Sequence, residues 1–281
     1  MLIASWNVNS IRTRLSNVLS WIEEKQPDIL CLQETKVIDE DFPVEVFIKL
    51  GYQVKCYGQK SYNGVAIISK KNISDIRYGF IGELKKLNVS DVLIEQKRII
   101  SAYIDGIRII NVYVPNGSSL NSEKYEYKIN WLRKLREYLN IQEARNEPTC
   151  ILGDFNIALK DIDIHNPDKY CGSIMASESE RYNLKMALNE RFTDSFRVFE
   201  KSSGHWSWWD YRNNSFELNR GWRIDHIYIS NNLLSNLKSS VIDRNQRAII
   251  QPSDHAPVMI NLDFNKNFVD FEEEENDIFD L

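Results

Sequence analysis

A short segment near the middle of the chain, Gly153-Asp154-Phe155-Asn156, combines residue types that a hydrolytic site uses. The apolar run 150–152 before it predicts a buried strand that breaks at the glycine. If the extended geometry continues, Asp154 and Asn156 project together from the end of a sheet while Phe155 packs inward, because residues i and i+2 share a face. A carboxylate beside an amide suits a hard divalent cation with an anionic oxygen next to it. The same residues also favour turns for backbone reasons alone, so the segment leaves both interpretations open.

The strands that must position this segment are predicted by eight short runs that are rich in β-branched residues and bounded by polar turns. The runs are Leu2–Val8, Ile29–Gln33, Gly64–Ser69, Arg98–Asp105, Arg108–Val114, Thr149–Leu152, Ile224–Ser230 and Ala256–Asp263. Asp105-Gly106 between two of them predicts a hairpin turn. Apolar residues at helical spacing predict helices over residues 11–22, 122–140 and 178–189. This mixture predicts an α+β fold in which two sheets pack face to face and helices flank them.

The chain has 281 residues, of which 43% are hydrophobic, and this composition is typical of a globular protein with a large core. No apolar run approaches the roughly 18 residues of a membrane span, and no basic leader precedes the first strand. The four cysteines lack close pairing such as C-x-x-C, which favours reduced core thiols over disulfides or zinc ligands. We therefore expect a cytoplasmic protein without a membrane partner, associated with the nucleoid if the source is bacterial.

The net charge of −5 is unevenly distributed. From Phe268 onward the chain carries seven acidic residues and no basic residue, which leaves 33 acidic against 35 basic residues in the body, a balance of +2. A local basic patch on that body could still bind phosphates. We expect one domain over residues 1–265 and an acidic, disordered tail over residues 266–281.

Polar residues recur just beyond the ends of the predicted strands at six places. They are Asn7 and Asn9, Gln33 and Glu34, Tyr113 and Asn116, Asp154 and Asn156, Asp225 and His226, and Ser253 to His255. Each alone has an ordinary interpretation as a turn or cap residue. Six such places, rich in carboxylates and amides and gathered at one edge of a sandwich, indicate a functional site.

Seven segments, in order along the chain, carry a family resemblance. They are Trp6–Arg12, Leu32–Lys36, Asn111–Gly117, Gly153–Asn156, Trp208–Arg212, Arg220–His226 and Ser253–Pro257. Together they resemble the exonuclease III family of abasic-site (AP) endonucleases, within the metal-dependent endonuclease/exonuclease/phosphatase superfamily that includes DNase I. The resemblance runs from Trp6 to about Leu262. It implies a DNase I-like, four-layer α/β sandwich of two mostly antiparallel sheets flanked by helices.

The resemblance also implies a Mg²⁺ cofactor, for which Mn²⁺ substitutes, bound at the strand ends. The implied metal site consists of Asn7, Glu34, Asp154, Asn156, Asp254 and His255. Glu34 is expected to be the most direct ligand. Asp154 is expected to orient and deprotonate the attacking water, and Asn156 to donate to the phosphate oxygen on which charge builds.

Further catalytic roles follow from the same resemblance. His255 is expected to contact the scissile phosphate, with Asp225 setting its tautomer and orientation. Tyr113 is expected to reach the phosphate as a hydrogen-bond donor or, with a depressed pKa, as a phenolate. Asn116 would complete the anion site on the DNA-binding side.

The implied DNA-binding residues lie in the aromatic segments. Trp208, Trp222 and Ile224 are expected to form an apolar pocket for a deoxyribose without its base. Arg212 and Arg223 are expected to hold flanking phosphates. The implied function is incision of double-stranded DNA 5′ to abasic sites and trimming of 3′ ends in base-excision repair, by a monomeric hydrolase.

Two other function classes stay open on the sequence alone. A sphingomyelinase or inositol-phosphate phosphatase of the same superfamily would share the acidic and amide positions but has no evident need for the aromatic segments. A catalytically inactive nucleic-acid-binding protein is disfavoured because every expected acidic and amide position is occupied. The apolar end of the tail, residues 278–281, could dock on a sliding clamp or another repair partner.

Overall fold

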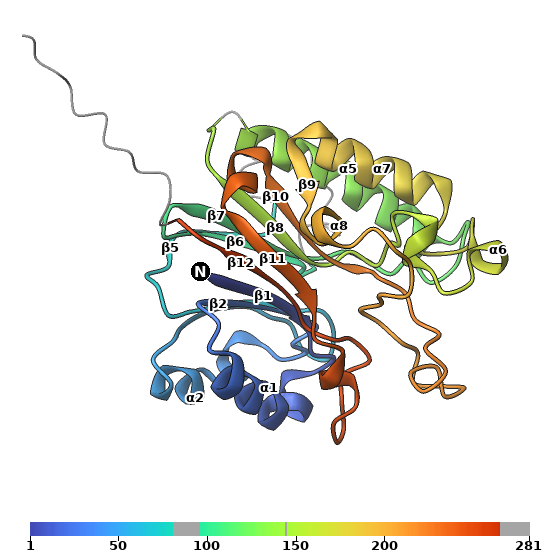
Figure 1. Ribbon diagram of the computed structural model, residues 1–281. Coiled ribbons are helices and arrows are strands. Elements are labelled where there is room, and N and C mark those ends of the chain that lie inside the picture. Colours follow the sequence, from blue (N-terminus) through green and yellow to red (C-terminus); the bar gives the residue numbers. More distant parts are fainter. Residues whose placement is uncertain (81–95, 144, 265–281) are drawn as a thin grey trace, which may run out of the picture.

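The computed structural model describes residues 1–80, 96–143 and 145–264, and it is a sandwich of two six-stranded sheets (Figure 1). The expected tail, residues 266–281, lies outside the described residues. Within them, no helix is both long and apolar enough to cross a membrane. All four cysteines are free thiols, as expected.

The first sheet contains the N-terminal strand at its centre. In spatial order it consists of β11 (Leu237–Ile242), β12 (Val258–Leu262), β1 (Leu2–Asn7), β2 (Ile29–Gln33), β4 (Val65–Ser69) and β3 (Gln53–Tyr57). The β1–β2 pair is parallel and the other pairs are antiparallel.

The second sheet has the same arrangement around its own parallel pair, β7–β8. In spatial order it consists of β5 (Ser74–Tyr78), β6 (Ile99–Ile104), β7 (Ile107–Tyr113), β8 (Thr149–Asp154), β10 (Asp225–Ser230) and β9 (Phe192–Asp194). A two-residue turn at Asp105 and Gly106 joins β6 to β7, and both residues have positive φ, which confirms the expected hairpin. All eight expected strands are present, and β3, β5, β9 and β11 are additional.

Helices cover the two outer faces of the sandwich (Figure 1). The three expected helices are α1 (Ile11–Lys25), α5 (Glu123–Glu143) and α7 (Glu178–Leu188), the last with the expected capping box between Ser177 and Glu180. Three short helices were not expected: α2 (Val44–Lys49), α6 (Pro167–Tyr170) and α8 (Ser195–Phe199). The four-layer arrangement with mostly antiparallel sheets is therefore confirmed.

Strand alternation explains how the layers hold together. In β8, Cys150 and Leu152 enter the core between the sheets, whereas Ile151 enters the core beneath α5 and α7. A central strand covered on both faces must be apolar throughout, which is why this run reads as continuous hydrophobic sequence. Asn111 of β7 makes polar contacts across the interior: its Oδ1 accepts from Gln33 Nε2 of β2 at 2.8 Å, and its Nδ2 donates to the carbonyl oxygens of Leu32 and Ala66, both at 2.9 Å.

The fold directs four strand ends to one edge of the sandwich. The parallel pairs β1–β2 and β7–β8 bring the carboxyl ends of all four strands there, because parallel neighbours end on the same side. Asp225, the first residue of the antiparallel strand β10, lies opposite Asp154 in the register. The six polar places of the sequence therefore converge on this edge.

Gly153 is required by the close contact between β7 and β8. Its φ is 146°, and a Cβ atom there would lie 1.9 Å from the carbonyl oxygen of Val112, its neighbour in the register. Backbone cannot yield as a flexible side chain can, so only glycine fits at this position.

We expect Gly153→Ala to lower the free energy of unfolding by about 3 kcal/mol or more, because overpacking and backbone strain add. Urea denaturation followed by tryptophan fluorescence measures the change. Gly106→Ala is the matched control, since Gly106 also has positive φ but has nothing within 4 Å of its added Cβ. This control should cost about 1 kcal/mol, and equal losses in the two variants would contradict the assigned contact.

Candidate active site

The side-chain amide of Asn7 joins two carboxylates that come from opposite sheets. Asn7 ends β1, Glu34 follows β2, and Asp154 ends β8 in the second sheet. Asn7 Nδ2 donates to Glu34 Oε1 at 2.8 Å and to Asp154 Oδ2 at 2.9 Å. Asn7 Oδ1 accepts the backbone N–H of Asn9 at 2.9 Å, so the amide oxygen is committed to its own turn. Asn7 therefore orients the carboxylates through its NH₂ group, and its expected contact with a metal ion stays a prediction.

Asp154 and Asn156 lie together, but a turn brings them together and not a continued strand. Asn156 has a φ of 49°, in the left-handed region, so the expectation of extended geometry past Gly153 is wrong. The backbone N–H of Asn156 donates to Asp154 Oδ1 at 2.8 Å, and its Nδ2 donates to Asp154 Oδ2 at 3.0 Å. This is an Asx-type turn, in which a short polar side chain replaces a backbone partner. Phe155 between them is buried in the core, as expected.

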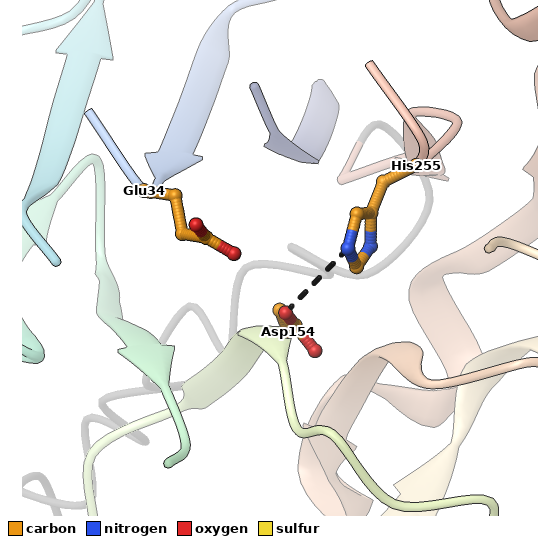
Figure 2. A group of neighbouring side chains, drawn as sticks. All are labelled: Glu34, Asp154 and His255. Carbon is orange, nitrogen blue, oxygen red and sulfur yellow. Dashed lines mark ion pairs between the residues drawn. The ribbon is translucent and has the colours of Figure 1, made fainter. Parts of the chain in front are cut away.

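His255 lies across the site from Glu34 (Figure 2), and Asp225 holds its ring by a hydrogen bond. His255 Nδ1 is 2.9 Å from Asp225 Oδ2, and His255 Nε2 is 3.8 Å from Asp154 Oδ2. Ser207 Oγ donates to Asp225 Oδ2 at 2.7 Å and accepts the backbone N–H of Asp225. No sequence motif indicated Ser207, which fixes the carboxylate of Asp225 that in turn fixes the imidazole of His255.

Burial and neighbouring charges set the protonation states of the three central groups. Burial alone would raise the pKa of Glu34, but Lys36 and the Asn7 amide outweigh it and lower that pKa. Burial raises the pKa of Asp154, and the charges of Asp225 and Glu34 add to the rise against the opposing charge of His255. Burial lowers the pKa of His255, but the carboxylates of Asp225 and Asp154 outweigh it, so the net shift is upward. The site thus holds an ionised Glu34, an imidazolium, and an Asp154 with raised proton affinity.

Glu34, Asp154 and His255 form a group that could hold a metal ion, because their possible ligand atoms all lie within 4.8 Å of one another (Figure 2). Two carboxylates from different elements suit a hard cation that keeps several waters. An imidazole that is protonated and held by Asp225 fits contact with an anion better than coordination of a cation.

Two further residues expected in the metal shell are engaged elsewhere. Asn156 Nδ2 donates to Asp154 and to the carbonyl oxygen of Val114. Asp254 accepts hydrogen bonds from Asn9 Nδ2 and from Trp208 Nε1, both at 3.0 Å. Asp254 lies outside the group of Glu34, Asp154 and His255, and the expected metal contacts of Asn156 and Asp254 stay predictions.

Tyr113 and Asn116 border the site from the end of β7. Burial and the charge of Glu34 raise the pKa of Tyr113 well above its ordinary value, which favours the phenol donor over the phenolate. The exposed Asn116 donates through Nδ2 to Asn156 Oδ1 at 2.9 Å. The guanidinium of Arg98 lies 4.6 Å from the centre of the Tyr113 ring and places positive charge beside it.

A cavity of about 400 Å³ adjoins the acidic centre, and Trp208, Trp222 and Met175 line it. Trp208 forms backbone bridges to both Trp222 and His255, which connects the cavity wall to the segment that carries the imidazole. Ile224 is buried in the same apolar cluster as Trp222 and does not line the cavity. Of the three residues that we expected to form the apolar pocket, Trp208 and Trp222 line the cavity, and Ile224 supports Trp222 from the core.

The two expected DNA-binding arginines have different environments. The side chain of Arg212 is 82% exposed and is paired with Asp210, so it is available to a phosphate. Arg223 is buried, with its Nε 2.8 Å from Asp163 Oδ1 and its Nη2 2.6 Å from Asp194 Oδ2. Its guanidinium is paired with these two carboxylates and is inaccessible to DNA. The expected DNA contact of Arg223 is therefore wrong, and the residue supports the Trp222 segment structurally.

Comparisons with known proteins agree with this fold and site. Residues 4–255 match the model of the "Endonuclease/Exonuclease/phosphatase family". An exodeoxyribonuclease III of Haemophilus influenzae is 36% identical over 270 residues, which cover 92% of this chain and 98% of that protein.

Solved structures agree with the sequence match. A 3′-5′ exonuclease from Neisseria meningitidis has a TM-score of 0.88 at 38% identity, covering 94% of this chain and 100% of that one. An AP endonuclease from Archaeoglobus fulgidus has a TM-score of 0.86 at 37% identity, covering 94% and 99%. The chain therefore belongs to the endonuclease/exonuclease/phosphatase family, in its exonuclease III group of abasic-site endonucleases.

Proposed function

We propose that this protein is a Mg²⁺-dependent DNA phosphodiesterase of base-excision repair that incises 5′ to abasic sites and trims 3′ ends. The observation that carries the proposal is the position of Asp154. Its buried carboxylate lies within 4.8 Å of ligand atoms of Glu34 and His255, and Trp208, which bridges to His255, lines the neighbouring cavity. Relatives named exodeoxyribonuclease III and AP endonuclease support the same reaction class.

The chain's own residues supply most of the chemistry. Asp154 accepts the proton of the attacking water, for which a buried carboxylate with raised pKa is suited. His255 and the phenol of Tyr113 donate to the phosphate oxygens, and Asp225 keeps the imidazole oriented. Glu34 and Asp154 would hold the Mg²⁺ ion, which when bound supplies positive charge beside a phosphate oxygen.

The cavity favours DNA over the substrates of other phosphoesterases. A deoxyribose that lacks its base is small and apolar enough to enter between Trp208 and Trp222, and the missing base lowers the cost of extruding it from the helix. A headgroup or inositol phosphate, being polar on every side, gains little from two indole rings. An inactive binding protein has no use for an ionised Glu34 held next to Asp154 by one amide.

Three finer points belong to the proposal. The enzyme acts as a monomer on double-stranded DNA, Mn²⁺ replaces Mg²⁺, and residues 266–281 form a tail separate from the catalytic domain 1–265. The acidic composition of that tail, with its apolar end, is typical of a segment that docks on a repair partner or sliding clamp.

The direct test is incubation of the purified protein with a duplex that carries one abasic site, in Mg²⁺ and in EDTA. We expect a single nick 5′ to the site in Mg²⁺ only, and trimming of a recessed 3′ end under the same conditions, both read on a denaturing gel. Cleavage in EDTA, or hydrolysis of sphingomyelin or inositol phosphates at a comparable rate, would contradict the proposal.

Asp154→Asn should lower kcat about 10²–10⁴-fold, the usual loss when a general base is removed, while binding of abasic DNA largely survives. Single-turnover incision measures the rate, and fluorescence anisotropy measures the affinity. Asp105→Asn is the matched control, because Asp105 lies in the β6–β7 hairpin, at the opposite end of β7 from the site. Near-full turnover of the Asp154 variant would remove Asp154 from the role of base.

Trp222→Ala should reduce incision at abasic sites more than metal-dependent hydrolysis of bis(p-nitrophenyl) phosphate, because only the first substrate needs the cavity. Both kcat/KM values are measured on the same preparation. Trp131→Ala removes another buried tryptophan, in the core beneath α5, and controls for lost stability. Equal loss on the two substrates would show that Trp222 does not form the sugar pocket.

A further inference from the structure

A buried ion pair lies directly behind the site and has no place in the roles assigned so far. Lys128 of α5 and Glu180 of α7 are both 0% exposed, with Nζ 2.5 Å from Oε1. Lys128 belongs to no motif in the sequence, although it lies three residues after Tyr125 and four before Leu132, on the apolar face of its helix. A lysine on such a face is unusual enough to require an explanation.

The ammonium group of Lys128 has three donors, and three acceptors surround it. Besides Glu180, it donates to the carbonyl oxygen of Asn156 at 2.8 Å and to that of Asn116 at 3.1 Å. These carbonyls belong to the two residues whose side-chain amides lie at the phosphate side of the site. One buried cation therefore binds the backbone of both residues from behind.

Glu180 is the fixed point of this arrangement. Its Oε2 accepts from the backbone N–H of Ser177 at 3.0 Å, and its Oε1 accepts from that of Met175 at 3.0 Å. Met175 lines the cavity, and its sulfur accepts from Asn116 Nδ2 at 3.5 Å. The pair thus connects the start of α7, the cavity wall and the phosphate side.

Stability alone does not account for a pair of charges at this depth. Burial lowers the pKa of Lys128, and the charges of Glu180 and Asp154 oppose that shift only in part, so the buried amine gains little stability from its charge. Apolar side chains of similar size often hold two helices together as well as a buried ion pair does. Apolar side chains cannot, however, donate to two carbonyl oxygens.

The two hydrogen bonds from Lys128 to the backbone carbonyls orient the side-chain amides of Asn116 and Asn156. Asn156 adopts a left-handed backbone with its carbonyl turned toward Lys128, and its amide contacts Asp154. Asn116 precedes Gly117, whose φ is 91°, and its amide donates to Asn156. Without the amine, both peptide units would be free to rotate, and with them the donors that hold Asp154 in place.

We propose that Lys128 is a positioning residue for the phosphate side of this site, acting through the backbone carbonyls of Asn116 and Asn156. The inference rests on the proposed function, since its readout is DNA incision. It assigns Glu180 the separate task of joining the amine to the backbone of Met175 and Ser177 at the start of α7.

The test compares two variants of the full-length protein on the abasic duplex. Glu180→Gln keeps one acceptor oxygen in place of two, a loss that both variants share, and the amine of Lys128, charged or neutral, keeps N–H donors for both carbonyl oxygens. The double variant Lys128→Met/Glu180→Gln removes both charges, so that no unpaired charge stays buried, and it loses only the amine. We expect kcat of the double variant to fall about 10–100-fold below that of Glu180→Gln, with KM changed much less, as for other groups that orient a catalytic residue.

Two controls separate positioning from folding. Arg108→Met removes another fully buried cation, which pairs with Asp75 and Glu147 at the opposite end of β7, and it should lower the melting temperature without changing kcat. In an Asn116→Ala/Asn156→Ala background the Lys128 effect on kcat should shrink to less than about threefold, because the groups that it positions are gone.

The outcomes are distinct. If the wild-type protein incises the duplex but the double variant keeps the kcat of Glu180→Gln, the positioning role is refuted while the proposed function stands. The role is also refuted if the loss of kcat persists undiminished in the Asn116→Ala/Asn156→Ala background. A wild-type protein without incision overturns the proposed function itself.

Discussion

One hydrogen-bonded amide holds the site together across the two halves of the molecule. The NH₂ group of Asn7 donates to Glu34 in one sheet and to Asp154 in the other, and no other single side chain described for the site contacts both carboxylates. Two anions so close repel each other, and burial strengthens the repulsion. The amide, the charge of Lys36 beside Glu34 and the charge of His255 beside Asp154 offset it. Each of these three groups depends on the sandwich for its position.

The sandwich provides that position through its two parallel strand pairs. The carboxyl ends of β1 and β2 carry Asn7 and Glu34, and those of β7 and β8 carry Tyr113 and Asp154. The Gln33–Asn111 contact lies one residue below this edge and fixes the sheets against sliding. A shift of one sheet over the other by a single residue, about 3.3 Å, would separate the carboxylates. The rigidity of the core is therefore a requirement of the chemistry.

The central strands and the candidate residues could be predicted from sequence because they share strong local signals. Strands such as β2 and β8, buried on both faces, read as uninterrupted apolar runs. The edge strands β3 and β5 have mixed, partly exposed residues and gave no such signal.

Contacts between residues that are far apart in the sequence could not be predicted from it. The partners of Arg223 are Asp163 and Asp194, 60 and 29 residues away, so its burial could not be foreseen. The left-handed turn at Asn156 is likewise bound by Lys128, which comes from α5.

The pairing of β1 with β12, Leu2 opposite Asn261, has a consequence for protein synthesis. Until the ribosome has released residues 254–262, the nascent chain lacks both His255 and the strand that fixes β1, so a growing polypeptide cannot cut nearby nucleic acid before its body is complete.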